Sequence, residues 1–299
     1  MGILDAVKTT LAGVTMAVIF GLSFMFTKNA LSFARPFEFL AFRFGISTVF
    51  ILMLLGLKVI KLRRKPYRKL LLVAVFQPVL YFIFETLGLS RIPSSEAGII
   101  IATIPIAVAI LSPIFLREYP RVLQIPFLVS SVFGVIFMVG MNSLQGDLLG
   151  DLLVLGAVLM AASYNIASRK FSKEFKPEET TFVMMLTGGL TFNVLALIDG
   201  IDYSKLLIPT VLIGAMYLGI FSSVTAFFLI NYMLTKVSPV QSSIFANLTT
   251  VVSVLAGTLI RQEQLHWYHL LGMAMILLGT WGVNYVGFKT KTRKEKELT

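Results

Sequence analysis

Long apolar runs and short polar connections alternate along the whole chain. Each run is about twenty residues long, the length a helix needs to cross a bilayer core about 30 Å thick. The connections are too short to hold a soluble domain. The pattern predicts an all-α integral membrane protein with ten transmembrane helices, near residues 10–31, 37–57, 69–90, 94–116, 121–141, 148–168, 179–198, 208–234, 239–260 and 267–288.

Composition agrees with this pattern and removes several classes of function. Hydrophobic residues make up 57% of the chain and charged residues 14%. Cysteine is absent, which excludes disulfides and thiolate metal sites. The sequence has no G-x-x-x-x-G-K-[ST] phosphate loop, so this chain does not hydrolyse ATP, and it has no H-E-x-x-H metalloprotease motif. We expect no cofactor, and any energy that the protein uses should come from a gradient or from a partner.

Positive charge is concentrated in the connections and indicates the orientation. With the N-terminus in the cytoplasm, flanking Lys and Arg residues number twenty on the cytoplasmic side and four on the other. Cytoplasmic loops carry such an excess, so we expect a cell-membrane protein with both termini cytoplasmic. Orientation explains the net charge of +11, and no nucleic-acid partner is expected. The first apolar run exceeds the h-region of a signal peptide, so no cleavable signal is expected.

A pattern in the first half of the chain returns 145 positions later. LSRIPSSEAGIIIATIPIAVAILSPIFLRE, which begins at Leu89, aligns with LTKVSPVQSSIFANLTTVVSVLAGTLIRQE, which begins at Leu234. We predict one five-helix module written twice, in residues 1–145 and in residues 146–299, the second ending in a charged cytoplasmic tail. The clearest aligned pairs are Arg91 with Lys236, Glu118 with Glu263, and Gly134 with Gly279.

An odd number of helices in each module means that the two modules enter the membrane from opposite sides. Inverted repeats of this kind recur in secondary transporters, with the substrate site at the repeat interface near the midplane. Two halves that exchange roles provide a physical route to alternating access, in which the site opens to one side at a time.

Short motifs stand at particular places in this order of spans. They are Phe20-Gly21 in the first span, Arg43-Phe44 in the second, Pro105 in the fourth, Glu118 and Glu263 after the fourth and ninth, and LLGMAMILLGTWGVN (Leu270–Asn284) in the tenth. In these features the chain resembles EamA-type members of the drug/metabolite transporter superfamily. The resemblance implies a transporter of small metabolites, often an exporter, with a central cavity lined mainly by spans one, three, four, six, eight and nine. Two positions depart from the pattern: Phe20, where a Trp-Gly pair is common, and Thr250, where the repeat would place a second proline.

Ionisable residues at membrane depth are the first candidates for function. Gln77, Tyr81 and Glu85 share one face of the third span. Lys28 and Arg43 are expected at a similar depth, as charges of an outer vestibule. Such groups usually face a cavity or each other, so two interpretations stay open. Either Glu85 contacts substrate or carries a proton, or it forms a structural pair with Arg43 or Lys28.

Aromatic and amide side chains complete the predicted site. Aromatic rings supply cation–π or stacking contacts, and asparagines supply hydrogen bonds, although in membranes they also join helices. In the second half, Asn165 lies at a depth comparable to the other asparagines. The set favours an amino acid-like or cationic amphipathic substrate. The predicted substrate-binding residues are Phe24, Tyr81, Glu85, Thr103, Tyr164, Asn231 and Asn247.

Pro105 lies in the middle of the fourth span and serves either as a hinge or in packing. The small residues Gly13, Ala17 and Gly21 predict close helix packing in the first span. His266 and His269 offer metal ligands only superficially, because they flank aromatic residues typical of a membrane boundary. We expect no metal site.

Two rival functions remain beside a carrier. A passive channel would need like polar groups along one pore. An intramembrane enzyme would need paired acids or a nucleophile with its base, and Glu85 is the only deep carboxylate in the predicted spans. The expected partners are the lipid bilayer and a small-molecule substrate, with proton coupling as an option, and the protein is either a monomer or a homodimer.

Overall fold

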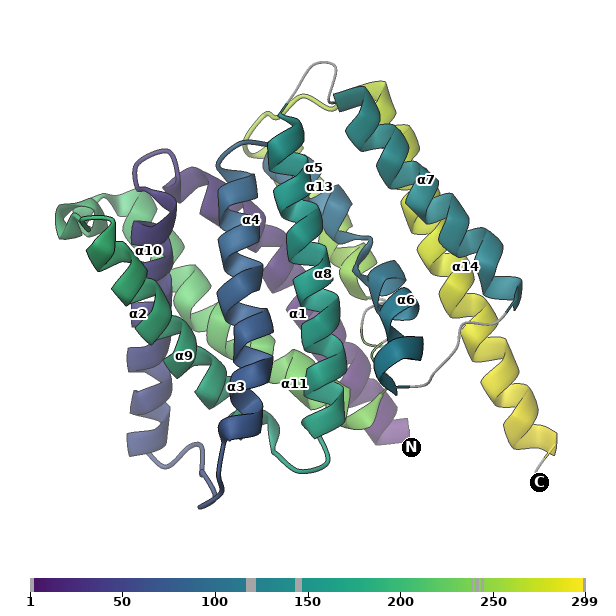
Figure 1. The fold of residues 1–299 in the computed structure, drawn as a ribbon, viewed down its shortest axis with the longest axis horizontal. Coiled ribbons are helices and arrows are strands. Elements are labelled where there is room, and N and C mark those ends of the chain that lie inside the picture. Colours follow the sequence, from purple (N-terminus) through teal and green to yellow (C-terminus); the bar gives the residue numbers. More distant parts are fainter. Residues whose placement is uncertain are drawn as a thin grey trace.

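The computed structural model describes residues 3–116, 122–142, 147–237 and 245–297, together with Pro239 and Ser242. Every regular element in these residues is helical, which confirms the all-α prediction (Figure 1). The elements are α1 Ile3–Ala30, α2 Pro36–Gly56, α3 Arg68–Ala74, η1 Val75–Leu80, α4 Tyr81–Leu89, α5 Ser94–Ile101, α6 Ile104–Leu116, η2 Val122–Gln124, α7 Ile125–Asn142, α8 Leu148–Phe171, α9 Pro177–Ile198, η3 Tyr203–Leu207, α10 Pro209–Tyr217, η4 Leu218–Ala226, α11 Phe227–Lys236, α13 Phe245–Leu259 and α14 Trp267–Glu297.

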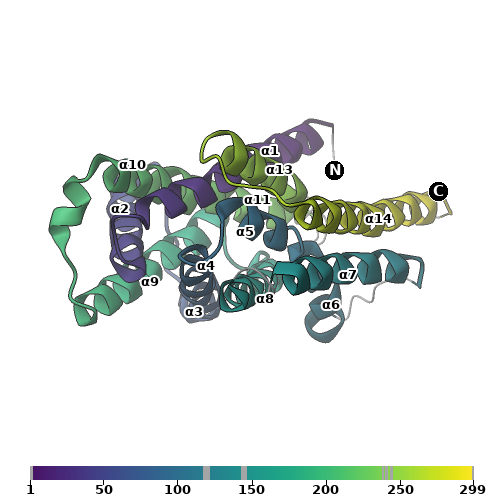
Figure 2. The same cartoon turned by 90° about the horizontal axis from the view of Figure 1, so that it is seen from above.

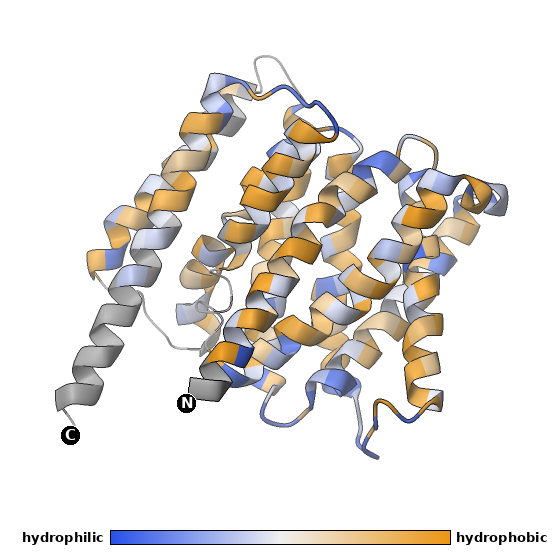
Figure 3. Ribbon diagram, turned by 180° about the vertical axis from the view of Figure 1, so that it is seen from behind, coloured by the Kyte–Doolittle hydropathy of each residue, from blue (hydrophilic) through white to orange (hydrophobic). Residues whose placement is uncertain are grey.

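The described helices form a multi-pass membrane protein. Seven helical segments are long and apolar enough to cross a membrane, and they match the first four and the sixth to eighth predicted spans. Shorter apolar stretches, Val122–Gly134, Leu248–Leu259 and Trp267–Gly279, occupy the remaining three. Large apolar side chains such as Leu190 and Leu212 are exposed on the outside. Polar residues gather at the two ends of the bundle (Figure 3).

Helices of the first half pack against helices of the second half throughout the bundle. Helix α1 lies along α13, α2 along α9, α4 along α8, and α5 against α13. Helices α7 and α14 form a pair at one side of the molecule (Figures 1 and 2). Because these contacts join the two halves, the core lies between them rather than within each one.

Two helices begin in the same way at corresponding places. Helix α2 starts at Pro36 and α9 at Pro177, positions where a helix needs no amide donor. Two residues later, Glu38 and Glu179 accept hydrogen bonds from the backbone amides that precede the prolines, at 2.9 and 2.8 Å. These local caps determine the residue at which the second span of each half begins.

Three of the membrane-crossing segments are interrupted. In the third, the π-helical turn η1 separates α3 from α4, and Gln77 beside Pro78 has non-helical dihedrals (φ −151°, ψ 118°). In the eighth, the π-helical turn η4 separates α10 from α11. In the fourth, α5 ends at Ile101 and α6 begins at Ile104. Single π turns are frequent at functional sites, and both π turns border the cavity described below.

Close packing of α1 on α13 confirms the role expected for the small residues of the first span. A Cβ atom at Gly21 would lie 2.5 Å from the Cβ of Val252, nearer than any real contact. One at Gly13 would lie 2.4 Å from the ring of Phe245. Glycine at these positions therefore lets the two helices touch along their backbones.

Candidate substrate-binding cavity

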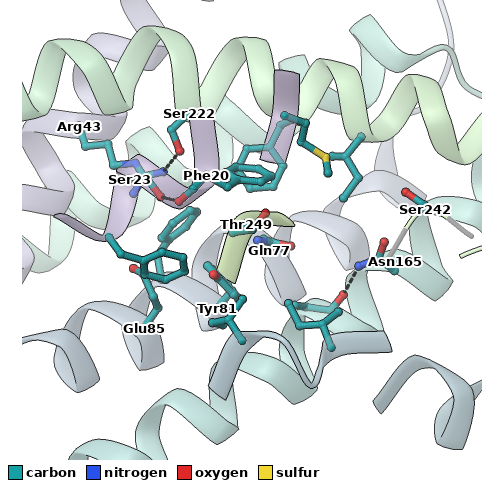
Figure 4. Close-up of a pocket in the computed structure, with 18 residues that line it drawn as sticks. Phe20, Ser23, Arg43, Gln77, Tyr81, Glu85, Asn165, Ser222, Ser242 and Thr249 are labelled. Carbon is teal, nitrogen blue, oxygen red and sulfur yellow. Dashed lines mark hydrogen bonds between the residues drawn. The ribbon is translucent and has the colours of Figure 1, made fainter. Parts of the chain in front are cut away.

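A cavity lies at the junction of the two halves of the chain. About 670 Å³ of space lies between its lining atoms, and part of that space is open at the mouth. The first half contributes lining residues from α1, α2, the third segment and the α5–α6 break. The second half contributes residues from α8, η4, α11 and α13, together with Ser242. Figure 4 shows these side chains converging from both halves.

Arg43 is the one cation among the described lining residues. Its side chain is buried, with 1% exposed. Nε donates to the hydroxyl of Ser223 at 3.0 Å and Nη2 to that of Ser222 at 2.9 Å, so the π turn η4 brings two consecutive hydroxyls to one guanidinium. Nη1 has no hydrogen-bond partner among the described residues. The guanidinium also lies over the ring of Phe82, 4.1 Å from Cζ to the ring centroid.

Glu85 is the one carboxylate of the described lining. It is as buried as Arg43, and its Oε2 accepts a hydrogen bond from Thr86 at 3.2 Å. No direct ion pair joins it to Arg43 or to Lys28 in the described residues, although both pairs were possible from the sequence. Lys28 instead donates to the carbonyl oxygen of Leu89 at 2.6 Å.

The far part of the cavity holds two further polar atoms without partners in the described structure. Asn165 donates from Nδ2 to the carbonyl oxygen of Ala161 at 2.8 Å, which leaves Oδ1 unsatisfied. The hydroxyl of Ser242 is also unsatisfied. In Figure 4 these two residues lie opposite Arg43, and Phe20 and Tyr81 lie between the two ends. The cavity therefore has polar groups at both ends, and aromatic rings together with the polar side chains of Gln77 and Thr249 between them.

A second polar cluster is fully satisfied and lies outside the cavity lining. Tyr164 and Ser168 of α8 both donate to Oδ1 of Asn231, at 2.9 and 2.7 Å. Nδ2 of Asn231 donates to the hydroxyl of Thr181 in α9 at 3.1 Å. These bonds join α8, α9 and α11, which is the helix-joining role of asparagine in membranes.

Four residues, Ser94, Ser95, Arg261 and Glu263, form a junction at the end of the bundle where α13 ends and α5 begins. Glu263 accepts bonds from the amides of Ser94 and Ser95 at 3.0 and 2.9 Å, and from the hydroxyl of Ser94 at 2.7 Å. Arg261 adds a contact of 2.9 Å. Burial alone would raise the pKa of Glu263, but these hydrogen bonds outweigh it and lower the pKa. We call this set the Glu263 junction.

Comparison with known sequences connects this geometry to a family. A model of the EamA-like transporter family matches residues 7–140 and, separately, residues 148–285. The chain belongs to the EamA-like transporter family. The resemblance seen in the sequence motifs is thereby confirmed.

EamA relatives with transporter names cover most of the chain. "Uncharacterized transporter YcxC" of Bacillus subtilis is 36% identical over 296 residues, 95% of both chains. An "Uncharacterized transporter" of Archaeoglobus fulgidus is 30% identical, over 87% of this chain and 92% of the relative. "Uncharacterized inner membrane transporter YedA" of Escherichia coli is 24% identical, over 62% and 60%. A protein of known crystal structure shares the fold, with a TM-score of 0.70 at 16% identity over 94% of this chain and 98% of that one.

Within this EamA fold, the predicted site residues separate into two groups. Phe24, Tyr81, Glu85 and Arg43 line the cavity. Tyr164 and Asn231 belong to the satisfied cluster behind its wall, and Lys28 is likewise outside the described lining. Their contact with substrate remains a prediction, and for Asn247 of α13 it falls on a side chain outside the described part. Glu118, Gln241 and Ser243 also lie outside the described residues.

The structure does not bring Thr103 to this cavity. Its hydroxyl donates to the carbonyl oxygen of Ile100 at 2.7 Å, across the break between α5 and α6. The residue lines an apolar groove bordered by α6, α7 and α8. Pro105 lies in the first turn of α6, just after this break. The sequence correctly marked an interruption here, whereas a hinge motion remains a prediction.

Sequence reasoning missed several residues that line the cavity or bind Arg43. Ser222 and Ser223 lie in an apolar run, and only the π turn brings both toward Arg43. Phe82 is next to the predicted Tyr81 and also lines the cavity. Phe20, the departure from the family's Trp-Gly pair, lines it as well and packs edge-on against Phe227, with ring centroids 5.5 Å apart. The depth of Asn165 was a usable signal for the opposite end.

Proposed function

We propose that this EamA-family protein is a secondary-active transporter that exports small metabolites by alternating access. The observation that carries the proposal is the cavity between the two halves, where polar atoms of Arg43 and Asn165 at opposite ends have no hydrogen-bond partner among the described residues. Buried polar groups are normally hydrogen-bonded. Groups left without partners inside a membrane protein favour a binding site for a polar ligand.

The architecture behind the proposal is ten transmembrane helices in two inverted five-helix repeats. Three observations support it: the family model matches twice, α2 and α9 begin with the same proline–glutamate cap, and both π turns lie in the third span of their half. The contacts between helices are also consistent with two repeats. The first span of each repeat packs against the fourth span of the other: α1 packs against α13, and α8 packs against α5 and α6. An odd number of spans per repeat then requires opposite insertion.

The location we propose is the cell membrane, with both termini in the cytoplasm. The excess of Lys and Arg in the connections on that side supports the orientation, and the Escherichia coli relative bears an inner-membrane name. This orientation puts the Glu263 junction on the outside. We propose that the junction holds the outer end closed and opens during the cycle.

The two rival functions are less well supported. A channel would present like groups along its pore, whereas this cavity has a cation at one end and neutral acceptors at the other. An enzyme would need a second acid or a nucleophile–base pair, and Glu85 is the one carboxylate among the described lining residues. The family is one of transporters.

The first experiment is a thermal-shift screen of the purified protein against amino acids, amines, nucleosides and sugars. A ligand that binds the folded state raises its stability by mass action. Each ligand found is then tested for counterflow in proteoliposomes. Saturable uptake that accelerates when unlabelled ligand is loaded inside is expected of a carrier. Uptake that neither saturates nor responds to internal ligand would identify a channel.

Glu85 tests whether the cavity is coupled to protons. We expect Glu85→Gln to remain monodisperse in detergent while its flux falls or changes its dependence on pH, because Gln cannot release a proton. Glu174→Gln, at the exposed Lys69–Glu174 pair, is the matched control and should transport normally. Wild-type flux of Glu85→Gln at every pH would refute both the proton role and the substrate role of Glu85.

A further inference from the structure

We infer that the cavity recognises its substrates by a carboxylate group, which binds Nη1 of Arg43. This inference deepens the proposed transport function and rests on it. It names the chemical class of the substrate: a small molecule with a carboxylate at one end, an apolar or aromatic body, and a hydrogen-bond donor toward the other end.

The first argument is the incomplete set of partners around Arg43. The hydroxyls of Ser222 and Ser223 accept from two guanidinium nitrogens but carry no charge. The third nitrogen, Nη1, has no described partner, and the side chain is 1% exposed. Glu85 acts on Arg43 electrostatically but makes no direct ion pair with it among the described residues. A buried cation without a directly bonded anion is costly, and pairing with good hydrogen-bond geometry offsets that cost. Carboxylate is an anion whose oxygens match guanidinium donors in a plane.

The second argument is the charge of the cavity as a whole. Arg43 and Glu85 are its one described cation and one described acid, and they form no direct ion pair. A phosphate dianion would place an excess of negative charge beside Glu85 in a buried space. A single carboxylate on the ligand neutralises the charge of Arg43. Glu85 is then either protonated or paired with an ammonium group of the same ligand. A ligand with an amine and no carboxylate would instead bring a second cation to Arg43.

The third argument is the lining between the two polar ends. Phe24 and Phe227 are buried, and Phe20 packs against Phe227. These rings offer an apolar surface for the body of a ligand. At the opposite end, Oδ1 of Asn165 accepts a hydrogen bond, so a ligand hydroxyl, amide or amine there satisfies it.

The test compares four probes that share one body and differ in the charged group. They are 3-phenylpropanoate, phenylalanine, 2-phenylethylamine and 3-phenylpropanamide, each titrated against the purified protein by calorimetry and thermal shift. The two carboxylates are expected to bind at least tenfold more tightly than the amine and the amide. Equal or tighter binding of the amine or the amide would overturn the inference, as would failure of both carboxylates to bind at millimolar concentration.

Variants then assign the effect to Arg43. Arg43→Gln is expected to weaken carboxylate binding by about 10- to 100-fold, the range for a lost charge-assisted hydrogen bond. Arg91→Gln is the control, because Arg91 pairs with Asp147 in a connection outside the cavity. If Arg43→Gln does not fold, Arg43→Lys keeps the charge without the planar fork, and about tenfold weaker binding is expected. Wild-type affinity for 3-phenylpropanoate in a folded Arg43→Gln or Arg43→Lys protein would overturn the inference.

Counterflow separates failure of this inference from failure of the transport function. Saturable exchange of compounds that lack a carboxylate, with none for 3-phenylpropanoate or phenylalanine, would leave a carrier whose substrate class is wrong. Carboxylate binding that depends on Arg43, without exchange in proteoliposomes, would keep the site and refute transport.

Discussion

Asn165 and Asn231 are the same residue type in the same half of the chain, yet their hydrogen bonds give them different roles. Asn231 is fully satisfied by Tyr164, Ser168 and Thr181, whereas Oδ1 of Asn165 is unsatisfied. We expect Asn231→Ala to lower the free energy of unfolding by about 1–3 kcal/mol, because it leaves buried hydroxyls unpaired. Asn165→Ala should change stability by less than about 1 kcal/mol and reduce substrate affinity. Denaturation in detergent measures the stability of both variants, and ligand titration measures their substrate affinity. Equal losses of stability in the two variants would contradict these roles.

The Glu263 junction makes stability depend on pH at the level of one carboxyl. The pKa of Glu263 is below the ordinary 4.5 because hydrogen bonds from Ser94 and Ser95 outweigh burial. A carboxyl with a lowered folded-state pKa adds stability above its unfolded pKa and loses it as pH falls through the folded value. Glu263→Gln should therefore melt below wild type at pH 7, and the difference should shrink as pH falls below the ordinary 4.5 and through the lower folded-state pKa. A melting-temperature difference that stays constant down to pH 3 would show that the charge is not what stabilises the junction.

At the scale of elements, the break in the fourth segment and its counterpart in α13 are built differently. Pro105 follows the α5–α6 break, whereas Thr250 lies in a continuous helix and donates to the carbonyl oxygen of Gly98 at 2.8 Å. We expect Pro105→Ala to insert normally, favour a straighter helix and slow exchange, because alanine allows the missing backbone bond. Thr250→Ala should loosen the α5–α13 contact, because it removes this hydrogen bond. Single-molecule distances across the outer mouth test the effect of Pro105→Ala. If this variant samples the same conformations as wild type, with the same populations and rates, Pro105 serves only in packing.

The interruptions also show which elements a sequence reveals. Pro78 and Pro105 mark two of the three breaks, because proline removes a backbone donor wherever it stands. The π turn at Leu218–Ala226 contains no proline, so no residue in that stretch of the sequence indicates an interrupted helix. The contact of Arg43 with Ser222 and Ser223 spans about 180 residues and depends on that turn. A single sequence places apolar runs well but does not distinguish an asparagine facing a cavity from one satisfied by neighbouring helices.

For the whole molecule, the predicted repeat and the charge pattern rest on features that extend over the full chain. The family model matches residues 7–140 and residues 148–285 separately. Which helices of the two halves touch was beyond the sequence, since apolar faces of similar composition do not specify their partners. The contact of α5 with α13 is one that only the structure provides.

The closure that we propose at the Glu263 junction leads to a prediction about the complete transport cycle. A Cβ atom at Gly257 would lie 3.0 Å from the Cβ of Ser95 and 2.5 Å from Oε2 of Glu263. A disulfide can therefore join α5 to α13 only after the Glu263 side chain moves aside. The natural chain has no cysteine, so Ser95→Cys with Gly257→Cys forms no competing bond. If alternating access separates these helices, the oxidised protein should bind ligand and lose more than 90% of its exchange, and reduction should restore it. The control is Gly134→Cys with Met275→Cys in the peripheral α7–α14 pair, where the corresponding separation is 2.9 Å. Its exchange should be unchanged by oxidation. Wild-type exchange by the oxidised α5–α13 variant would mean that this junction stays closed throughout the cycle and that access to the cavity follows another path.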